Sequence, residues 1–100
     1  MAIELTKLTD LEDYKEELMK GIIKNPINLL GEAFLKWHCP EGAERKTVYA
    51  RMGAIYRDCY RDPYFVLEGI WDTKDCHVVG SRLNYLAATL RRRLHGEGVS

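Results

Sequence analysis

Three cysteines and three histidines are the side chains of this 100-residue chain best suited to metal binding or nucleophilic chemistry. They include two adjacent pairs, His38-Cys39 and Cys76-His77, with Cys59 between them in the sequence. A zinc ion needs four ligands that converge tetrahedrally. Adjacent residues on a helix point about 100° apart, so neither pair is suited to deliver both members to one ion. We therefore predict no metal site and no cofactor.

A nucleophilic site could combine Cys59 or Cys76 with His77 as base and Asp75 as its orienting group. A reactive thiolate needs an exposed, electropositive setting and an oriented base. Cys59, however, falls on the apolar side of a helical pattern, where free cysteine commonly acts as a small buried hydrophobe. The sequence also has no distinctive carboxylate pair and no glycine-rich phosphate loop. We predict that the protein is not an enzyme.

The tightest basic cluster is Arg91-Arg92-Arg93, which together with Arg57 and Arg61 could contact phosphate groups. Cations in the last turn of a helix are also favoured by the helix dipole, without any ligand. The sequence shows no clear turn of a helix-turn-helix motif between the last predicted helices. Nucleic-acid binding through Arg91, Arg92 and Arg93 is therefore the alternative function.

The charge of the chain is zero in total but unevenly distributed. Residues 1–42 carry five Lys/Arg and eight Asp/Glu, whereas residues 43–100 carry ten and seven. A nucleic-acid-binding domain usually has a net basic balance or a concentrated basic stripe. The totals argue mildly against that function, while the basic C-terminal half keeps it open.

The longest segment with a single helical phase predicts a central helix over about residues 43–62. Its apolar face repeats at helical spacing through Val48, Met52, Ile55 and Cys59. The same phase aligns three tyrosines on one flank and places two arginines, with small residues, on the far side. Tyrosine and arginine are enriched where proteins bind other proteins. The predicted partner-binding residues are Tyr49, Tyr56, Tyr60, Arg57 and Arg61.

Two helices are predicted before the central one. The stretch Thr9-Asp10-Leu11-Glu12 has the pattern of a capping box with Thr9 as its cap, so a helix should start there and stop near Lys24. Asn25-Pro26 then combines a capping residue with proline at the first helical position, which predicts the start of a second helix. Residues 39–42, Cys-Pro-Glu-Gly, should end it.

Two alternatives remain open after the central helix. In residues 64–71 the β-branched and aromatic side chains favour a strand, whereas the preceding Asp62-Pro63 favours a short helix, which we predict. From Thr73 to Leu94 the apolar spacing is consistent with one helix. Equally, Ser81 could cap a new helix after a break at Val79-Gly80.

The apolar faces of these predicted helices are expected to form one core. Its predicted members are Leu18, Ile22, Leu30, Phe34, Trp37, Val48, Met52, Ile55, Leu83, Leu86 and Leu90. A chain of this length can bury enough apolar surface to fold without disulfides or a metal. The predicted fold is therefore an all-α, compact bundle of four to five helices with short connections.

The domain prediction is a single helical domain over residues 1–100, with residues 1–8 and 96–100 as flexible or extended arms. An odd cysteine count without close spacing favours a reducing compartment, so we expect a cytoplasmic protein. The sequence has no apolar run near the ~20 residues of a membrane span.

The predicted function is a small non-enzymatic interaction module, an adaptor or inhibitor that occupies a surface of a larger protein or complex, alone or as a homodimer.

Overall fold

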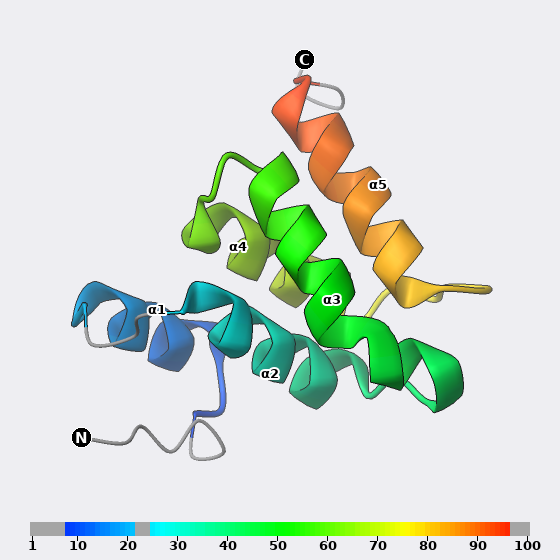
Figure 1. The fold of residues 1–100 in the computed structure, drawn as a ribbon, viewed down its shortest axis with the longest axis horizontal. Helices are drawn as coiled ribbons and strands as arrows, with labels where there is room; N and C mark the ends of the chain where they lie inside the picture. The colour runs from blue at the N-terminus through cyan, green and yellow to red at the C-terminus, as the bar shows by residue number, and fades with distance from the viewer. Residues whose placement is uncertain (1–7, 22–24, 97–100) are drawn as a thin grey trace.

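The computed structural model describes residues 8–21 and 25–96, and this part of the chain is helical throughout its regular structure (Figure 1). Its five helices are α1 (Leu11–Met19), α2 (Pro26–His38), α3 (Gly42–Asp58), α4 (Pro63–Thr73) and α5 (Arg82–Leu94). The predicted all-α bundle is confirmed. The predicted arms fall largely on residues 1–7 and 97–100, which lie outside the described residues.

Helices α2 and α4 start at the two Asx-Pro pairs, as predicted. The Asn25 side chain accepts a hydrogen bond from the amide of Ile27 at 3.1 Å. The Asp62 side chain accepts one from the amide of Phe65 at 3.2 Å. These contacts satisfy backbone donors that have no partner inside a helix. Residues 64–71 are therefore helical, and the strand alternative is wrong.

The cap of α1 differs from the prediction by one residue. Asp10, not Thr9, is the capping residue, and its carboxylate accepts from the amide of Asp13 at 3.0 Å. The Asp13 carboxylate in turn accepts from the Thr9 hydroxyl at 2.7 Å. Asp13 therefore occupies the position predicted for Glu12, because the box begins one residue later.

Helix α1 also ends earlier than predicted, at Met19. Gly21 follows with φ 70°, a left-handed conformation that ends helices and that glycine adopts without steric cost. The predicted end near Lys24 and the predicted core residue Ile22 fall within residues 22–24, outside the described residues.

Helix α3 ends at Asp58 rather than at Asp62. Tyr60 and Arg61 take the left-handed conformation, with φ 57° and 56°, which costs a non-glycine residue roughly 1–2 kcal/mol. The amide of Arg61 donates to the carbonyl of Tyr56 at 2.9 Å and closes this turn. Tyr60 and Arg61 are consequently not on the helix, so the predicted row of tyrosines is interrupted.

The single helix predicted as one option from Thr73 to Leu94 is wrong. The alternative, in which Ser81 caps a new helix, is correct, but the break is longer than Val79-Gly80 because α4 already ends at Thr73. Gly80 has φ 93°, and the Val79 side chain, expected in the apolar stripe, is 90% exposed. Ser81 caps α5 by accepting a hydrogen bond from the amide of Asn84 at 3.1 Å. A connection over residues 74–81 therefore separates α4 from α5.

One buried apolar cluster joins all five helices. Its members are Tyr14, Leu29, Leu30, Ala33, Phe34, Val48, Met52, Ile55, Cys59, Val66, Leu67, Ile70, Leu83, Leu86 and Leu90. Leu18 and Trp37, also predicted as core, pack against the cluster but are only partly buried. The core also contains Val66, Leu67 and Ile70 of α4, which were not among the predicted core residues.

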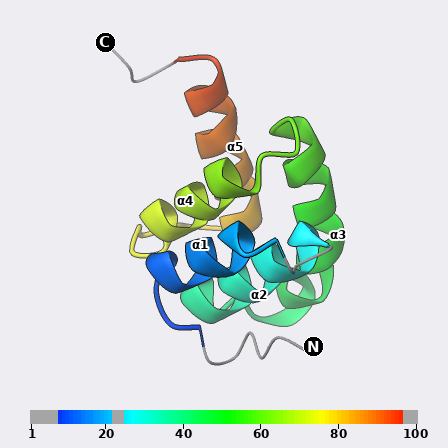
Figure 2. The same cartoon turned by 90° about the vertical axis from the view of Figure 1, so that its left-hand side faces the viewer.

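Helices α4 and α5 approach closely at a glycine. A Cβ atom at Gly69 would overlap the side chain of Leu90 on α5. Glycine is therefore required at this position for the two helices to pack as they do. From this contact, α5 continues past the other helices, and Figures 1 and 2 both show its C-terminal end rising above the rest of the molecule.

Candidate interaction cleft

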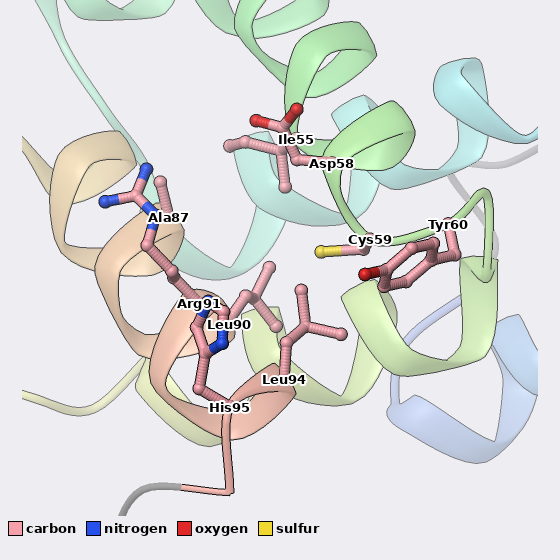
Figure 3. Close-up of a pocket in the computed structure, with 9 residues that line it drawn as sticks. All are labelled: Ile55, Asp58, Cys59, Tyr60, Ala87, Leu90, Arg91, Leu94 and His95. Atoms are coloured by element: carbon pink, nitrogen blue, oxygen red, sulfur yellow. The ribbon is translucent and has the colours of Figure 1, made fainter.

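A cleft of about 400 Å³ opens between the C-terminal end of α3 and the second half of α5 (Figure 3). It is lined by Ile55, Asp58, Cys59, Tyr60, Ala87, Leu90, Arg91, Leu94 and His95. Clefts of roughly 300–1,000 Å³ that combine apolar walls with a few polar groups are the usual form of small-molecule and cofactor sites. We therefore take this cleft as the candidate site.

The floor of the cleft is apolar and comes from both helices. Leu90 and Leu94 lie one turn apart on α5, with Ala87 one turn before them. Ile55, in the last turn of α3, and Cys59, the residue directly after the helix, have the same spacing. Side chains four residues apart share a helix face, so each helix presents a short apolar row to the space between them.

The rim of the cleft is polar and exposed. Tyr60 is 84% exposed, although its ring bounds the apolar floor and its hydroxyl lies on the cleft side in Figure 3. Arg91 and His95 form the rim on α5, and Asp58 forms it on α3. The Arg91 side chain makes no hydrogen bond or ion pair with the described residues. The rim therefore has an exposed aromatic ring, Tyr60, and a cationic side chain, Arg91, that is free to bind a partner.

The Cys59 thiol behaves as part of the apolar floor. Burial raises the pKa of Cys59 to about 11, with further contributions from the negative charges of Asp58 and Asp62. A thiol with this pKa stays protonated near neutral pH and is a poor nucleophile. Its sulfur points into the cleft in Figure 3, where it offers a small, neutral surface.

The three predicted tyrosines have different environments. Only Tyr60 lines the cleft. The Tyr49 hydroxyl donates to a Glu32 carboxylate oxygen at 2.5 Å, and its ring packs over Gly31, where a Cβ would lie 2.5 Å from Cε1. Burial and the hydrogen bond to Glu32 raise the pKa of Tyr49 to about 12. Tyr56 is partly buried against the core. Tyr49 and Tyr56 therefore have packing roles within the bundle.

The predicted basic residues are also separated. Arg57 and Arg61 are exposed beside the segment that forms the α3 rim. Of the three consecutive arginines, Arg91 lines the cleft and Arg93 forms an ion pair with Asp72 of α4 at 3.0 Å. The Arg92 guanidinium lies 3.5 Å from the Thr89 hydroxyl of its own helix. Two predicted site residues therefore line the same cleft: Tyr60, which was predicted to bind a protein, and Arg91, which was predicted to bind nucleic acid.

The base of α5 is held by a polar cluster that the sequence did not indicate. The His38 ring is stacked on Phe34, with 4.4 Å between the ring centroids. Its Nδ1 accepts a hydrogen bond from Arg82 Nε at 2.8 Å, and its Nε2 donates to the carbonyl of Ile70 at 3.0 Å. Both nitrogens are satisfied, so His38 joins the ends of α2 and α4 to the start of α5.

Glu44 of α3 supports the same end of α5. One of its carboxylate oxygens accepts from the amide of Leu83 at 2.7 Å and from the hydroxyl of Ser81 at 2.8 Å. A carboxylate that accepts from the first amides of a helix also complements the positive end of the helix dipole. Glu44 thereby fixes α5 to α3 at the end opposite the cleft.

The His38 environment predicts that acidification destabilises the protein. Burial lowers the pKa of His38, as does the nearby Arg82 cation, while the hydrogen bond to Ile70 and the charges of Glu44 and Asp75 act in the opposite direction. The folded chain therefore binds fewer protons than the unfolded chain just below the ordinary histidine pKa of about 6.5. Stability is complete above that pH and falls as the pH decreases toward the lowered pKa.

Urea unfolding at a series of pH values from 7.5 to 5 tests this expectation. We expect the free energy of unfolding to decrease over that range in the wild type. The variant His38→Gln retains a donor and an acceptor without the titration, so its decrease should be smaller. Equal pH dependence in the two proteins would show that His38 does not control it.

In the described part of the chain, no group of three or more His, Cys, Asp and Glu side chains is arranged to hold a metal ion. No helix among the described residues has the length and apolarity needed to cross a membrane. Comparisons with models of protein families, with curated proteins and with solved structures find no match for this chain.

Proposed function

We propose that this protein is a small non-enzymatic interaction module that binds a larger protein or complex through the cleft between α3 and α5. One observation carries the proposal: the floor of the cleft is apolar, and its rim holds the exposed ring of Tyr60 and the unpaired side chain of Arg91. Tyrosine and arginine are, with tryptophan, the side chains enriched among the residues that dominate binding energy, and these residues cluster in pockets that exclude water.

The cleft replaces the central helix as the proposed binding surface. Tyr49 and Tyr56 are engaged within the bundle, whereas Tyr60 projects into solvent from the turn after α3. The three cysteines are free, which fits the reducing cytoplasm as the place where the module acts. In such a role the module is an adaptor or an inhibitor that covers part of its partner.

Two substitutions at adjacent positions on α5 test the proposal. Ala87 lines the cleft, whereas Ala88 is exposed and does not. Ala87→Trp should therefore fill the cleft, and Ala88→Trp adds the same side chain outside it. Immobilised wild type and both variants are incubated with lysate of the native cell, and the captured proteins are compared by quantitative mass spectrometry.

We expect a protein retained by the wild type and by Ala88→Trp to be reduced at least tenfold with Ala87→Trp. Tyr60→Ala should weaken the same complex by about 1 kcal/mol or more, as the loss of an anchor does. Circular dichroism checks that each variant keeps its helical content. Equal capture by the two tryptophan variants would contradict the cleft as the binding site.

A further inference from the structure

The connection between α4 and α5 is bound at its start by the side chain of Arg82. Arg82 Nη2 donates to the carbonyl of Thr73 at 3.2 Å and to the carbonyl of Lys74 at 2.9 Å. None of residues 74–80 is buried, and the segment runs as a loop beside the start of α5 (Figure 1). Arg82 therefore ties the beginning of this loop to the base of α5.

His38 holds the Arg82 guanidinium in this position. Arg82 Nε donates to His38 Nδ1 at 2.8 Å, and a guanidinium has no acceptor atom, so Nδ1 must be unprotonated. The ring proton is therefore on Nε2, which donates to the carbonyl of Ile70 at 3.0 Å. The contact with Arg82 consequently requires a neutral His38 in this one tautomer.

A second proton can bind the His38 ring only at Nδ1, the nitrogen that has a free lone pair. Protonation would place two N–H donors and two positive charges 2.8 Å apart, in a site where His38 is only 6% exposed. The hydrogen bond to Ile70 is unaffected because Nε2 keeps its proton. The ring therefore stays on α4, and Arg82 is the group that must move.

The charged groups that face His38 come from several elements. Arg82 belongs to α5, Glu44 to α3 and Asp75 to the connection, while α4 presents the Ile70 carbonyl and the Thr73 hydroxyl. Burial and the Arg82 cation lower the pKa of His38 and outweigh the hydrogen bond to Ile70 and the two carboxylates. A form in which Arg82 has left binds the proton more readily, so its population rises as the pH falls below about 6.5.

We propose that His38 and Arg82 form a latch that acid opens: a proton on Nδ1 expels the Arg82 guanidinium, and residues 74–80 detach while the helices stay packed. The helices remain in place because the core side chains of α5 are buried and Glu44 separately binds the first turn of that helix. The latch is independent of the proposed binding function. It makes the exposure of this loop depend on pH in the range of histidine titration.

Amide hydrogen exchange, followed by NMR in the full-length protein, tests the latch. The reporter is the Cys76 amide, which donates to the Thr73 carbonyl at 3.2 Å. We expect its protection factor to fall at least threefold from pH 7 to pH 5.5, with the same midpoint as the His38 ring resonances. One proton allows a change of at most about tenfold per pH unit.

Urea separates release of the loop from unfolding of the whole protein. At pH 5.5, adding 0.5 M urea should accelerate exchange of the Leu86 amide in the middle of α5. It should leave the Cys76 amide nearly unchanged, because release of the loop exposes little new surface. If urea accelerated both amides equally, the loop would open only by global unfolding, and the latch would be wrong.

His77 provides the matched control because it is exposed and lies in the same loop. His77→Gln should keep the pH dependence of the Cys76 amide, whereas His38→Gln should lose it. Arg82→Gln should lower the protection at least threefold already at pH 7, with little further loss at pH 5.5. If His38→Gln fails to fold, Arg82→Gln and the wild-type titration decide the question. Protection that is independent of pH in the wild type, or unchanged at pH 7 in Arg82→Gln, would overturn the proposal.

Discussion

Replacing Phe34 with alanine is expected to lower the free energy of unfolding by about 3–5 kcal/mol. Phe34 is fully buried on α2, and its ring stacks on His38 with 4.4 Å between centroids. The substitution removes the apolar contacts of the ring and leaves a cavity that the surrounding helices fill only partly. It also removes the surface that orients His38 toward Arg82. Urea unfolding followed by circular dichroism measures the loss.

Phe65→Ala is the matched control for this prediction. Phe65 lies in the first turn of α4 and is only partly buried against the core. Its removal should cost less than half as much, since water already reaches part of the ring. Equal losses for the two variants would show that Phe34 is not central to the core.

Glu44→Ala is expected to destabilise the protein by about 1.5–3 kcal/mol, the range for hydrogen bonds to a charged group. The substitution removes both hydrogen bonds of the carboxylate, and it leaves the Leu83 amide at the start of α5 without its acceptor. Glu44→Gln keeps a carbonyl oxygen and should recover part of the loss. Thermal unfolding of the three proteins measures the difference.

Glu41→Ala is the control for the glutamate substitution. Glu41 stands before α3 and makes no side-chain cap hydrogen bond. Its exposed side chain should contribute less than about 0.5 kcal/mol. A Glu44→Ala effect as small as that of Glu41→Ala would show that the carboxylate does not hold α5 in place.

Signals within a few residues were sufficient to predict much of the fold. Asn25-Pro26 and Asp62-Pro63 predict the starts of α2 and α4 because capping and the missing proline donor act locally. The spacing of Val48, Met52 and Ile55 predicts the buried face of α3 for the same reason. All three of these side chains are buried.

The end of α3 could not be predicted from its own periodicity. The apolar phase continues through Cys59, and a helix extended to Asp62 would keep it. Asp62 must instead be extended, with φ −97° and ψ 99°, to cap α4. The chain therefore turns at Tyr60 and Arg61, since the start of one helix competes with the continuation of the other.

The cleft depends on contacts between distant segments, which no local pattern records. Tyr60 follows α3 and Arg91 belongs to α5, and sequence reasoning assigned them to different functions. The hydrogen bond between His38 and Arg82 likewise joins residues 44 positions apart. Periodicity identifies which side of a helix is buried, but it does not identify the helix that covers it. The site therefore required the tertiary structure.

The two ends of α5 are attached very unequally, with a consequence for local motion. Its first turn is fixed by Glu44 and by Arg82, whereas its last turns border the cleft on one side and are held to α4 by the solvent-exposed ion pair between Arg93 and Asp72. Amide hydrogen exchange in a native protein reports such differences, because weakly held segments open without global unfolding. The amides of Arg93 and Leu94 should therefore exchange through a partial opening of low free energy. The amide of Leu86 should exchange only when the whole bundle unfolds. The C-terminal end of α5 can then move away from α3 and widen the cleft while the first turns of α5 stay folded.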